Sequence, residues 1–146
     1  LLYFVDRYGA AGSAYDQDWE FAPDWQDRVR QASAPLTYLD PLTHNVHRGR
    51  MVHWADFYER LFNFREIRYF DIEGKVTGLF SKAMTSPCGK IRIPLNESQD
   101  DKSQIEEFLR EYKGEGIQHI ALGSDDIYAS VDILSARGIP FQDTPD

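Results

Sequence analysis

The 146-residue chain lacks three features that would point to other classes of protein. Its single cysteine, Cys88, leaves no disulfide within the chain, which fits a reducing, cytoplasmic compartment. It has no run of basic residues, and a net charge of −8 repels phosphate backbones, so we expect no nucleic-acid partner. No apolar run approaches the roughly 20 residues that cross a bilayer, so we expect no membrane partner.

Apolar and aromatic residues are present in the amounts that a globular domain needs, at 42% and 14% of the chain. Met51, Ala55, Tyr58 and Phe62 recur at intervals of three or four residues. This spacing predicts an amphipathic helix whose apolar side faces a core.

The other predicted elements follow from caps, turns and alternating apolar residues. A hairpin is expected over 73–78, with Gly74 near its tip. The segments with strand character are 1–8, 42–46, 65–72, 78–86, 90–97, 117–122 and 139–141, and two further helices are expected from Ser103 to 112 and from Ser124 to Gly138.

Two segments of the chain repeat one pattern. "LTHNV" (42–46) and "IQHIA" (117–121) each centre a histidine on an alternating strand that is followed by a helix and a return strand. The chain therefore contains a βαβββ module over 42–100 and an incomplete second module over 114–146. Such a half-barrel cannot cover its own concave face, so two modules must pair.

The repeat makes His44 and His119 candidate ligands of one metal ion, because pairing the modules brings equivalent positions of their first strands together. His47 is the rival partner of His44. An odd spacing on a strand sends the two side chains to opposite faces, which argues against that pair. We interpret His47 and His53 as solvent-facing, although an ordinary structural role for all four histidines stays open on the spacing alone.

The motifs "LTHNVHRGR", "SKAM", "IPLNE", "SQIEEFL" and "GIQHIAL" resemble the catalytic domain of bacterial 4-hydroxyphenylpyruvate dioxygenases. The resemblance extends over nearly all of 42–140. It implies an α+β fold of vicinal-oxygen-chelate (glyoxalase-like) βαβββ modules, with the second module truncated. Residues 1–41 resemble the last strand of an N-terminal domain and an interdomain segment, and 42–146 the catalytic-type domain. We therefore expect a piece of a longer protein.

The resemblance also implies a site. It gives one Fe(II) per catalytic domain, bound by His44, His119 and a glutamate expected beyond residue 146, a ligand set that leaves coordination positions open. Because alternation starts Gln118 on the strand face opposite to His119, its place in the pocket depends on a twist of the strand. The residues that match substrate-binding positions are Ser81, Pro94, Asn96, Gln104 and Gln118.

The implied reaction converts 4-hydroxyphenylpyruvate and O₂ to homogentisate and CO₂, a step of tyrosine and phenylalanine breakdown. The substrate's own 2-oxo acid would chelate the iron, so no general base is needed for the first oxidation. Two alternatives stay open: a hydroxymandelate synthase of the same family, and a catalytically incomplete fragment that lacks the third ligand. The open sheet edge of a truncated module also leads us to expect a homo-oligomer.

Overall fold

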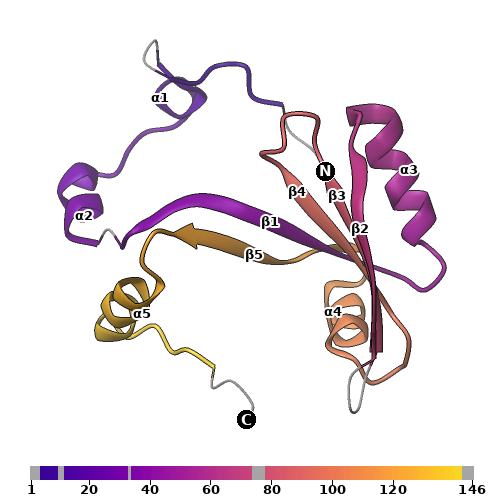
Figure 1. Cartoon of the computed structure of the whole chain (residues 1–146). Coiled ribbons are helices and arrows are strands. Elements are labelled where there is room, and N and C mark those ends of the chain that lie inside the picture. The colour runs from indigo at the N-terminus through magenta and orange to yellow at the C-terminus, as the bar shows by residue number, and fades with distance from the viewer. Residues whose placement is uncertain (1–3, 10–11, 33, 74–77, 143–146) are drawn as a thin grey trace.

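A five-stranded mixed sheet organises the chain (Figure 1). The computed structural model describes residues 4–9, 12–32, 34–73 and 78–142. The strands are arranged in the order β2-β3-β4-β1-β5, with β1 parallel to β4 and every other neighbouring pair antiparallel. Their bounds are β1 Leu36–Val46, β2 Arg65–Glu73, β3 Gly78–Thr85, β4 Arg92–Ser98 and β5 Gly116–Ser124.

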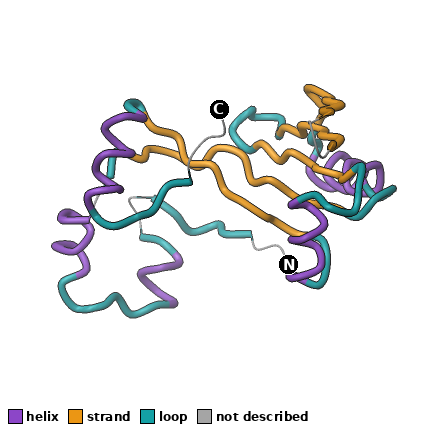
Figure 2. The backbone as a smooth tube through the Cα atoms, turned by 90° about the horizontal axis from the view of Figure 1, so that it is seen from below, coloured by secondary structure: helices purple, strands orange, loops and turns teal. Residues whose placement is uncertain are grey.

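Five helices accompany the described part of the sheet. In both views α2 and α5 lie near the end where β1 begins, and α3 and α4 lie at the other end (Figures 1 and 2). None of the helices in the described ranges is long and apolar enough to cross a membrane. Their bounds are α1 Ala14–Asp18, α2 Trp25–Ala32, α3 Met51–Phe62, α4 Gln104–Tyr112 and α5 Ile127–Ala136.

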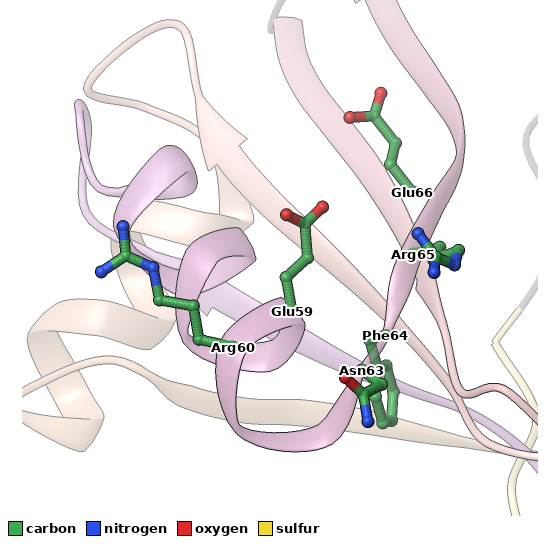
Figure 3. A pocket seen from close by; sticks show the side chains of 6 residues that line it. All are labelled: Glu59, Arg60, Asn63, Phe64, Arg65 and Glu66. Carbon is green, nitrogen blue, oxygen red and sulfur yellow. The ribbon is translucent and has the colours of Figure 1, made fainter.

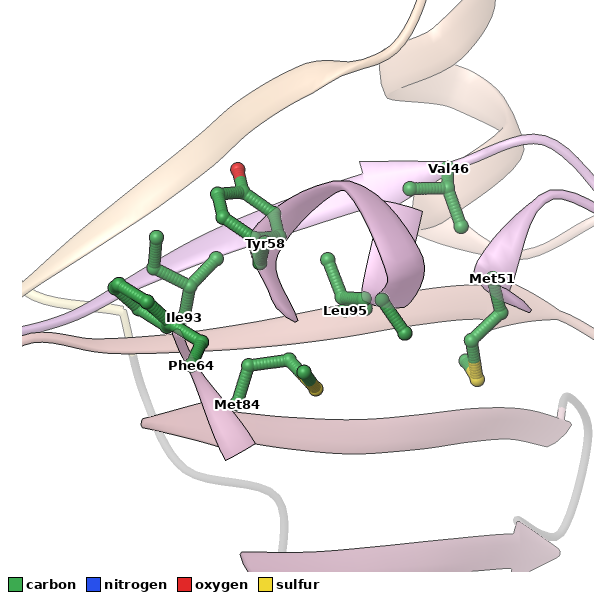
Figure 4. Close-up of a cluster of buried hydrophobic side chains, with 8 residues drawn as sticks. Val46, Met51, Tyr58, Phe64, Met84, Ile93 and Leu95 are labelled. Carbon is green, nitrogen blue, oxygen red and sulfur yellow. The ribbon is translucent and has the colours of Figure 1, made fainter. Parts of the chain in front are cut away.

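The main core lies between α3 and one face of the sheet (Figure 4). The predicted stripe of α3 is buried at Met51, Ala55 and Tyr58, while Phe62 is partly buried and packs against the same cluster. Alternation along the strands aims a matching set of apolar side chains at the helix. That set consists of Val46 of β1, Met84 of β3 and Ile93 and Leu95 of β4, with Phe64 just after the helix.

Most of the predicted elements are confirmed. The helix after the first histidine strand, the return strand and the strands around "SKAM", "IPLNE" and "IQHIAL" all form. Ser103 caps α4, since its side chain accepts a hydrogen bond from the Glu106 backbone N–H. The first strands of the two modules, β1 and β5, are neighbours, as the repeat predicted. The hairpin tip at Gly74 lies outside the described residues.

Several predictions about the ends of the chain are wrong. The described residues Phe4–Tyr8 form no strand, and neither do 139–141, because no neighbouring strand in the described ranges pairs with either segment.

The predicted cap of α5 is also wrong. The cap is Asp126, not Ser124, because the Asp126 carboxylate accepts a hydrogen bond from the Ala129 N–H. The Ser124 hydroxyl instead hydrogen-bonds Ser130, at 2.7 Å.

The start of β1 also differs from the prediction. The strand begins at Leu36, six residues before the expected start at 42, because its first half pairs with the far end of β5. Two short helices, α1 and α2, lie in the preceding segment, where no sustained periodicity had indicated them. The segment before the first histidine is thus joined to the sheet through β1.

Candidate functional site

His44 lies near the C-terminal end of β1 and is almost fully buried, with 4% of its surface exposed. Its ring is held between two aromatic side chains of α3. The Trp54 ring stands edge-on with its centroid 4.6 Å away, and Tyr58 Oη lies 3.1 Å from His44 Nδ1. Nδ1 is therefore engaged, and Nε2 is the nitrogen left for a further partner.

A pocket of about 360 Å³ opens beside His44. It is bounded by side chains of α3, by β1 and β4, and by the segment that joins α4 to β5, so it lies where the two modules meet. The residues that line it are Leu42, His44, Trp54, Phe57, Tyr58, Ile93, Tyr112, Glu115, Gly116 and Ile117.

Burial sets the protonation state of His44. Removal from water disfavours the imidazolium and lowers the pKa of His44 to about 4, and the negative charge of Glu115 only partly opposes this. The ring is therefore neutral at pH 7, which is the form that binds metals. Burial likewise raises the pKa of the Tyr58 hydroxyl to about 12, so that group stays protonated.

Glu115, which directly precedes β5, contacts residues that follow β1. Its carboxylate accepts the His47 backbone N–H at 3.0 Å and faces the Arg50 guanidinium at 3.4 Å. Partial burial tends to raise the pKa of Glu115, but the Trp54 indole, the His47 N–H and Arg50 outweigh it and hold that pKa below its usual range. The Trp54 N–H is buried and has no partner of hydrogen-bonding geometry among the described residues.

The depressed pKa of His44 predicts a pH effect. The unfolded pKa is 6.5 and the folded one about 4, so the unfolded chain takes up the proton first as the pH falls. Stability is then full above pH 6.5 and decreases down to about pH 4, by on the order of 2 kcal/mol after allowance for solvent screening. In the metal-free protein, the His44 ring resonances should titrate near pH 4 by NMR. A midpoint near 6.5 would show that the ring is solvated.

His119 has different surroundings. It lies on β5, its side chain is exposed, and its Nδ1 is 3.2 Å from the Gln118 side-chain Oε1. Consecutive side chains on a regular strand point to opposite faces and cannot meet. The Gln118–His119 contact therefore shows that β5 is irregular at this point.

A register shift separates the two candidate ligands. Thr43 pairs with His119, whereas His44 pairs with Ile117, so Gln118 is the extra residue of a bulge. Bulges re-aim side chains and are frequent beside active sites. Ile117 lines the pocket next to His44, and His119 is two residues further along the same strand. The structure thus brings the two strands together but not the two imidazoles: His44 faces α3, whereas His119, opposite Thr43, belongs to the other face of the sheet.

Each of the two imidazoles has one ring nitrogen with a partner and one without a partner among the described residues. Each imidazole has Nδ1 beside a neighbouring oxygen, Tyr58 Oη or Gln118 Oε1, which leaves Nε2 available. The described residues contain no group of three or more His, Cys, Asp or Glu side chains that could hold an ion by themselves. The glutamate expected beyond 146 stays a prediction.

Three of the expected substrate residues share the sheet face turned away from α3. Ser81 of β3 pairs with Asn96 of β4, and Ala83 pairs with Pro94, two residues before Asn96. Leu95, between Pro94 and Asn96, points into the α3 core. Ser81 is buried, and Pro94 and Asn96 are half-buried. His119 is paired with Thr43, the β1 residue between Leu42 and His44.

The remaining candidates lie apart from the pocket. Gln104 is the first residue of α4 and is exposed, and His47 and His53 are exposed, as predicted. A second hollow, of about 490 Å³, shares no lining residue with the pocket beside His44 and lies at the junction of α3 and β2, where most of its side chains are charged (Figure 3). Its lining residues are Glu59, Arg60, Asn63, Phe64, Arg65 and Glu66.

Trp54, Tyr58 and Glu115 were missed by the sequence reasoning. Tyr58 carried a signal, since it belongs to the apolar stripe of α3, but the stripe indicated only burial. Trp54 lies between the stripe and the solvent face, and Glu115 sits in a turn-like "KGEG" segment. Only the packing of α3 against β1 reveals that all three surround one histidine.

Known proteins resemble this chain over its whole length. It is 66% identical over 146 residues to Hemolysin VllY of Vibrio vulnificus and, at the same identity and length, to 4-hydroxyphenylpyruvate dioxygenase of Pseudomonas aeruginosa. All of the chain is covered, but only 41% and 40% of those relatives. The chain thus spans well under half the length of the curated relatives it matches.

The fold has a counterpart among solved structures. A mutant of 4-hydroxymandelate synthase from Streptomyces coelicolor superposes with a TM-score of 0.72 and 32% identity, over 76% of this chain and 35% of that one. The predicted α+β fold of vicinal-oxygen-chelate type is thereby confirmed. The family model described as Glyoxalase/Bleomycin resistance protein/Dioxygenase superfamily matches residues 42–146, and the chain belongs to that family.

Proposed function

We propose that this chain is part of an Fe(II)-dependent, non-haem dioxygenase that converts 4-hydroxyphenylpyruvate and O₂ to homogentisate and CO₂. The observation that carries the proposal is the 66% identity, across the entire chain, to the Pseudomonas aeruginosa protein of that name. The neutral His44 ring and the pairing of its strand with the His119 strand support the proposal. The reaction would belong to tyrosine and phenylalanine breakdown.

The proposed iron site has two ligands in this chain, His44 and His119, and a glutamate outside it. When bound, the iron would activate O₂ and orient the 2-oxo acid of the substrate. Trp54 and Tyr58 keep water from the His44 ring and fix its position. The chain would need to supply no general base for the first oxidation.

The proposed substrate contacts use uncharged polar side chains. Ser81 and Asn96, matched across β3 and β4, would orient the substrate through a hydroxyl and an amide without adding charge near the iron. Pro94 would form a rigid wall beside them. Gln118 would contribute through its contact with His119, and Gln104 from the start of α4.

Hydroxymandelate synthase activity is the second candidate. It is favoured by the structural similarity to the Streptomyces coelicolor enzyme. The two activities share substrate and metal but oxidise different carbons, so they yield different products. A third possibility is that the chain alone is a catalytically incomplete fragment, because one ligand lies outside it.

One experiment separates these candidates. Fe(II) and 4-hydroxyphenylpyruvate are added to the chain of residues 1–146 and to a protein extended through the second module, and O₂ uptake and products are followed. We expect turnover to homogentisate in the extended protein only. Hydroxymandelate as the product would select the second candidate, and no turnover in the extended protein would contradict the proposed activity.

Assembly and location are further parts of the proposal. Strand β5 is an edge of the described sheet, and Ile120 and Leu122 on it are half-exposed to solvent, so self-association would cover apolar surface. Homo-oligomers are therefore expected, and a monomer in sedimentation would contradict this. The single Cys88 supports a cytoplasmic location, which cell fractionation would test.

A further inference from the structure

We infer that the pocket beside His44 binds a small, uncharged aromatic molecule that carries one hydroxyl group, such as a phenol. At about 360 Å³, the pocket has the volume of a small-molecule site. It lies on the α3 side of the sheet, whereas Ser81 and Asn96, the proposed substrate contacts, lie on the other side. The inference therefore adds a second site to the chain and does not depend on the proposed reaction.

The α3 side of the pocket is aromatic. Trp54, Phe57 and Tyr58 lie on successive turns of this helix and all line the pocket. The ring of Phe57 meets the Trp54 ring at 71° and the Tyr58 ring at 84°, with centroids 5.3 and 5.4 Å apart. Rings at such angles and distances attract one another, and a further aromatic ring can pack against them in the same way.

The rest of the apolar lining comes from three strands and the segment before β5. Leu42 of β1, Ile93 of β4 and Ile117 of β5 supply aliphatic side chains. At the exposed end of the pocket the Tyr112 ring lies against Gly116, where a Cβ atom would be only 2.6 Å from the ring. The pocket is thus apolar along its length and has an aromatic ring at its opening.

The imidazole of His44 offers the pocket one ring nitrogen. His44 Nδ1 is 3.1 Å from Tyr58 Oη, and Nε2 has no partner among the described residues. Figure 4 shows the Tyr58 hydroxyl pointing out of the core cluster, away from the apolar side chains around Leu95. A hydroxyl group both donates and accepts, so a ligand hydroxyl can pair with Nε2 in either tautomer of the imidazole.

The charges around the pocket favour an uncharged ligand. Its lining residues include no lysine or arginine, and its one carboxylate, that of Glu115, is engaged by the His47 N–H at 3.0 Å and by Arg50 at 3.4 Å. An anion would lie near this carboxylate without a cationic lining side chain, and burying an unpaired charge is costly. The pocket therefore disfavours 4-hydroxyphenylpyruvate, which carries a carboxylate.

The volume of the pocket guides the choice of probe. An apolar cavity of about 150 Å³ holds benzene, and this pocket, at about 360 Å³, is large enough for two fused rings. 2-Naphthol has two fused rings, one hydroxyl and no charge at neutral pH. Its matched comparator is 2-naphthoate, which has the same rings and a carboxylate in place of the hydroxyl.

Calorimetry on the metal-free whole protein, extended through the second module, measures the binding of both probes. We expect 2-naphthol to bind at one site with a dissociation constant on the order of 0.1 mM. 2-Naphthoate should bind at least about 10-fold more weakly, because its charge would be buried without a partner. Undetectable binding of 2-naphthol, or equal affinity for the two probes, would overturn the inference.

The substitution Ile117→Trp places a larger side chain in the pocket. Its matched control is Ile120→Trp, because Ile120 lies on the same strand, is 56% exposed and does not line the pocket. We expect Ile117→Trp to weaken 2-naphthol binding at least about 10-fold, since it removes the space for the ligand, and Ile120→Trp to leave it unchanged. Unchanged affinity in Ile117→Trp would overturn the inference.

A second readout locates the ligand in the wild-type protein. The fused rings of bound 2-naphthol shift the NMR resonances of the groups that they contact. We expect the indole N–H resonance of Trp54 to move on titration and that of Trp25, which is on α2 and does not line the pocket, to stay in place. Movement of Trp25 without Trp54 would overturn the inference, and this test needs no substitution.

This inference and the proposed function fail in distinguishable ways. If the extended protein binds 2-naphthol at Trp54 but does not turn over 4-hydroxyphenylpyruvate, only the proposed activity is wrong. If it turns over that substrate but does not bind 2-naphthol, only the inference about the pocket is wrong.

Discussion

Replacing His44 or His119 with alanine should abolish iron binding by the extended protein, whereas His47→Ala should leave binding nearly intact. The repeat places His44 and His119 at equivalent sequence positions of two modules, and the first strands of these modules pair in the structure with His119 opposite Thr43. His47 is exposed, and its backbone N–H, not its ring, is engaged with Glu115. Losing one of three protein ligands removes most of the metal-binding free energy, because no other side chain takes the vacated coordination position.

Titration of the metal-free variants with Fe(II), under anaerobic conditions, measures this directly. His47→Ala is a matched control because it is three residues from His44 and alters the same segment of chain. Loss of iron in His47→Ala together with retention in His119→Ala would show that the ligands come from one strand and its loop. The pairing of ligands across the repeat would then be wrong.

Leu95→Ala should cost the protein about 2–5 kcal/mol of unfolding free energy. Leu95 is completely buried at the centre of the α3 core, on the strand parallel to β1, and pairs in register with His44. Truncation leaves a cavity that rigid strands on both sides cannot fill. It should also loosen the support of the His44 strand, so iron affinity should decrease along with stability.

The control for this substitution is Leu61→Ala. Leu61 is on α3 but 62% exposed, so the same truncation should change the unfolding free energy by less than about 0.5 kcal/mol. Urea unfolding of the metal-free protein supplies both values. Equal effects of the two substitutions would mean that the cluster around Leu95 does not form the core of the domain.

The parts of the fold that the sequence predicts well are those with strong local signals. The α3 stripe has the period of a helix, and the strands around Ser81, Asn96 and His119 have the alternation or composition of strands. The Ser103 cap was predictable because a serine followed three residues later by a glutamate is the sequence pattern of a helix start. At the start of α5, three candidate caps stand in a row, and sequence could not show that Asp126 rather than Ser124 is used.

The ends of β1 and β5 were less predictable because pairing, not propensity, determines them. Residues 36–41 contain Pro41 and Asp40 and read as a connecting segment, but partners on β5 extend the strand through them. The apolar segments at Phe4–Tyr8 and 139–141 have strand composition and lack such partners among the described residues. The amino-acid composition of a segment does not show whether a neighbouring strand is available to pair with it.

The candidate site shows the same limit. Matched positions in a repeat predicted that the His44 and His119 strands meet, and they do. The bulge at Gln118, which changes how the two side chains are aimed, leaves no mark on the sequence pattern. The tyrosine and tryptophan that enclose His44 were visible only as apolar helix residues, because their contact depends on how α3 lies on the sheet.

The central claim is that one histidine from each module binds the same iron ion. Pulsed electron paramagnetic resonance on the extended protein, loaded with Fe(II) and nitric oxide, counts the imidazole nitrogens coupled to the iron. The account predicts couplings from two histidines, of which one is lost in His44→Ala and the other in His119→Ala. Couplings from a single histidine, or two that survive in His119→Ala, would contradict it.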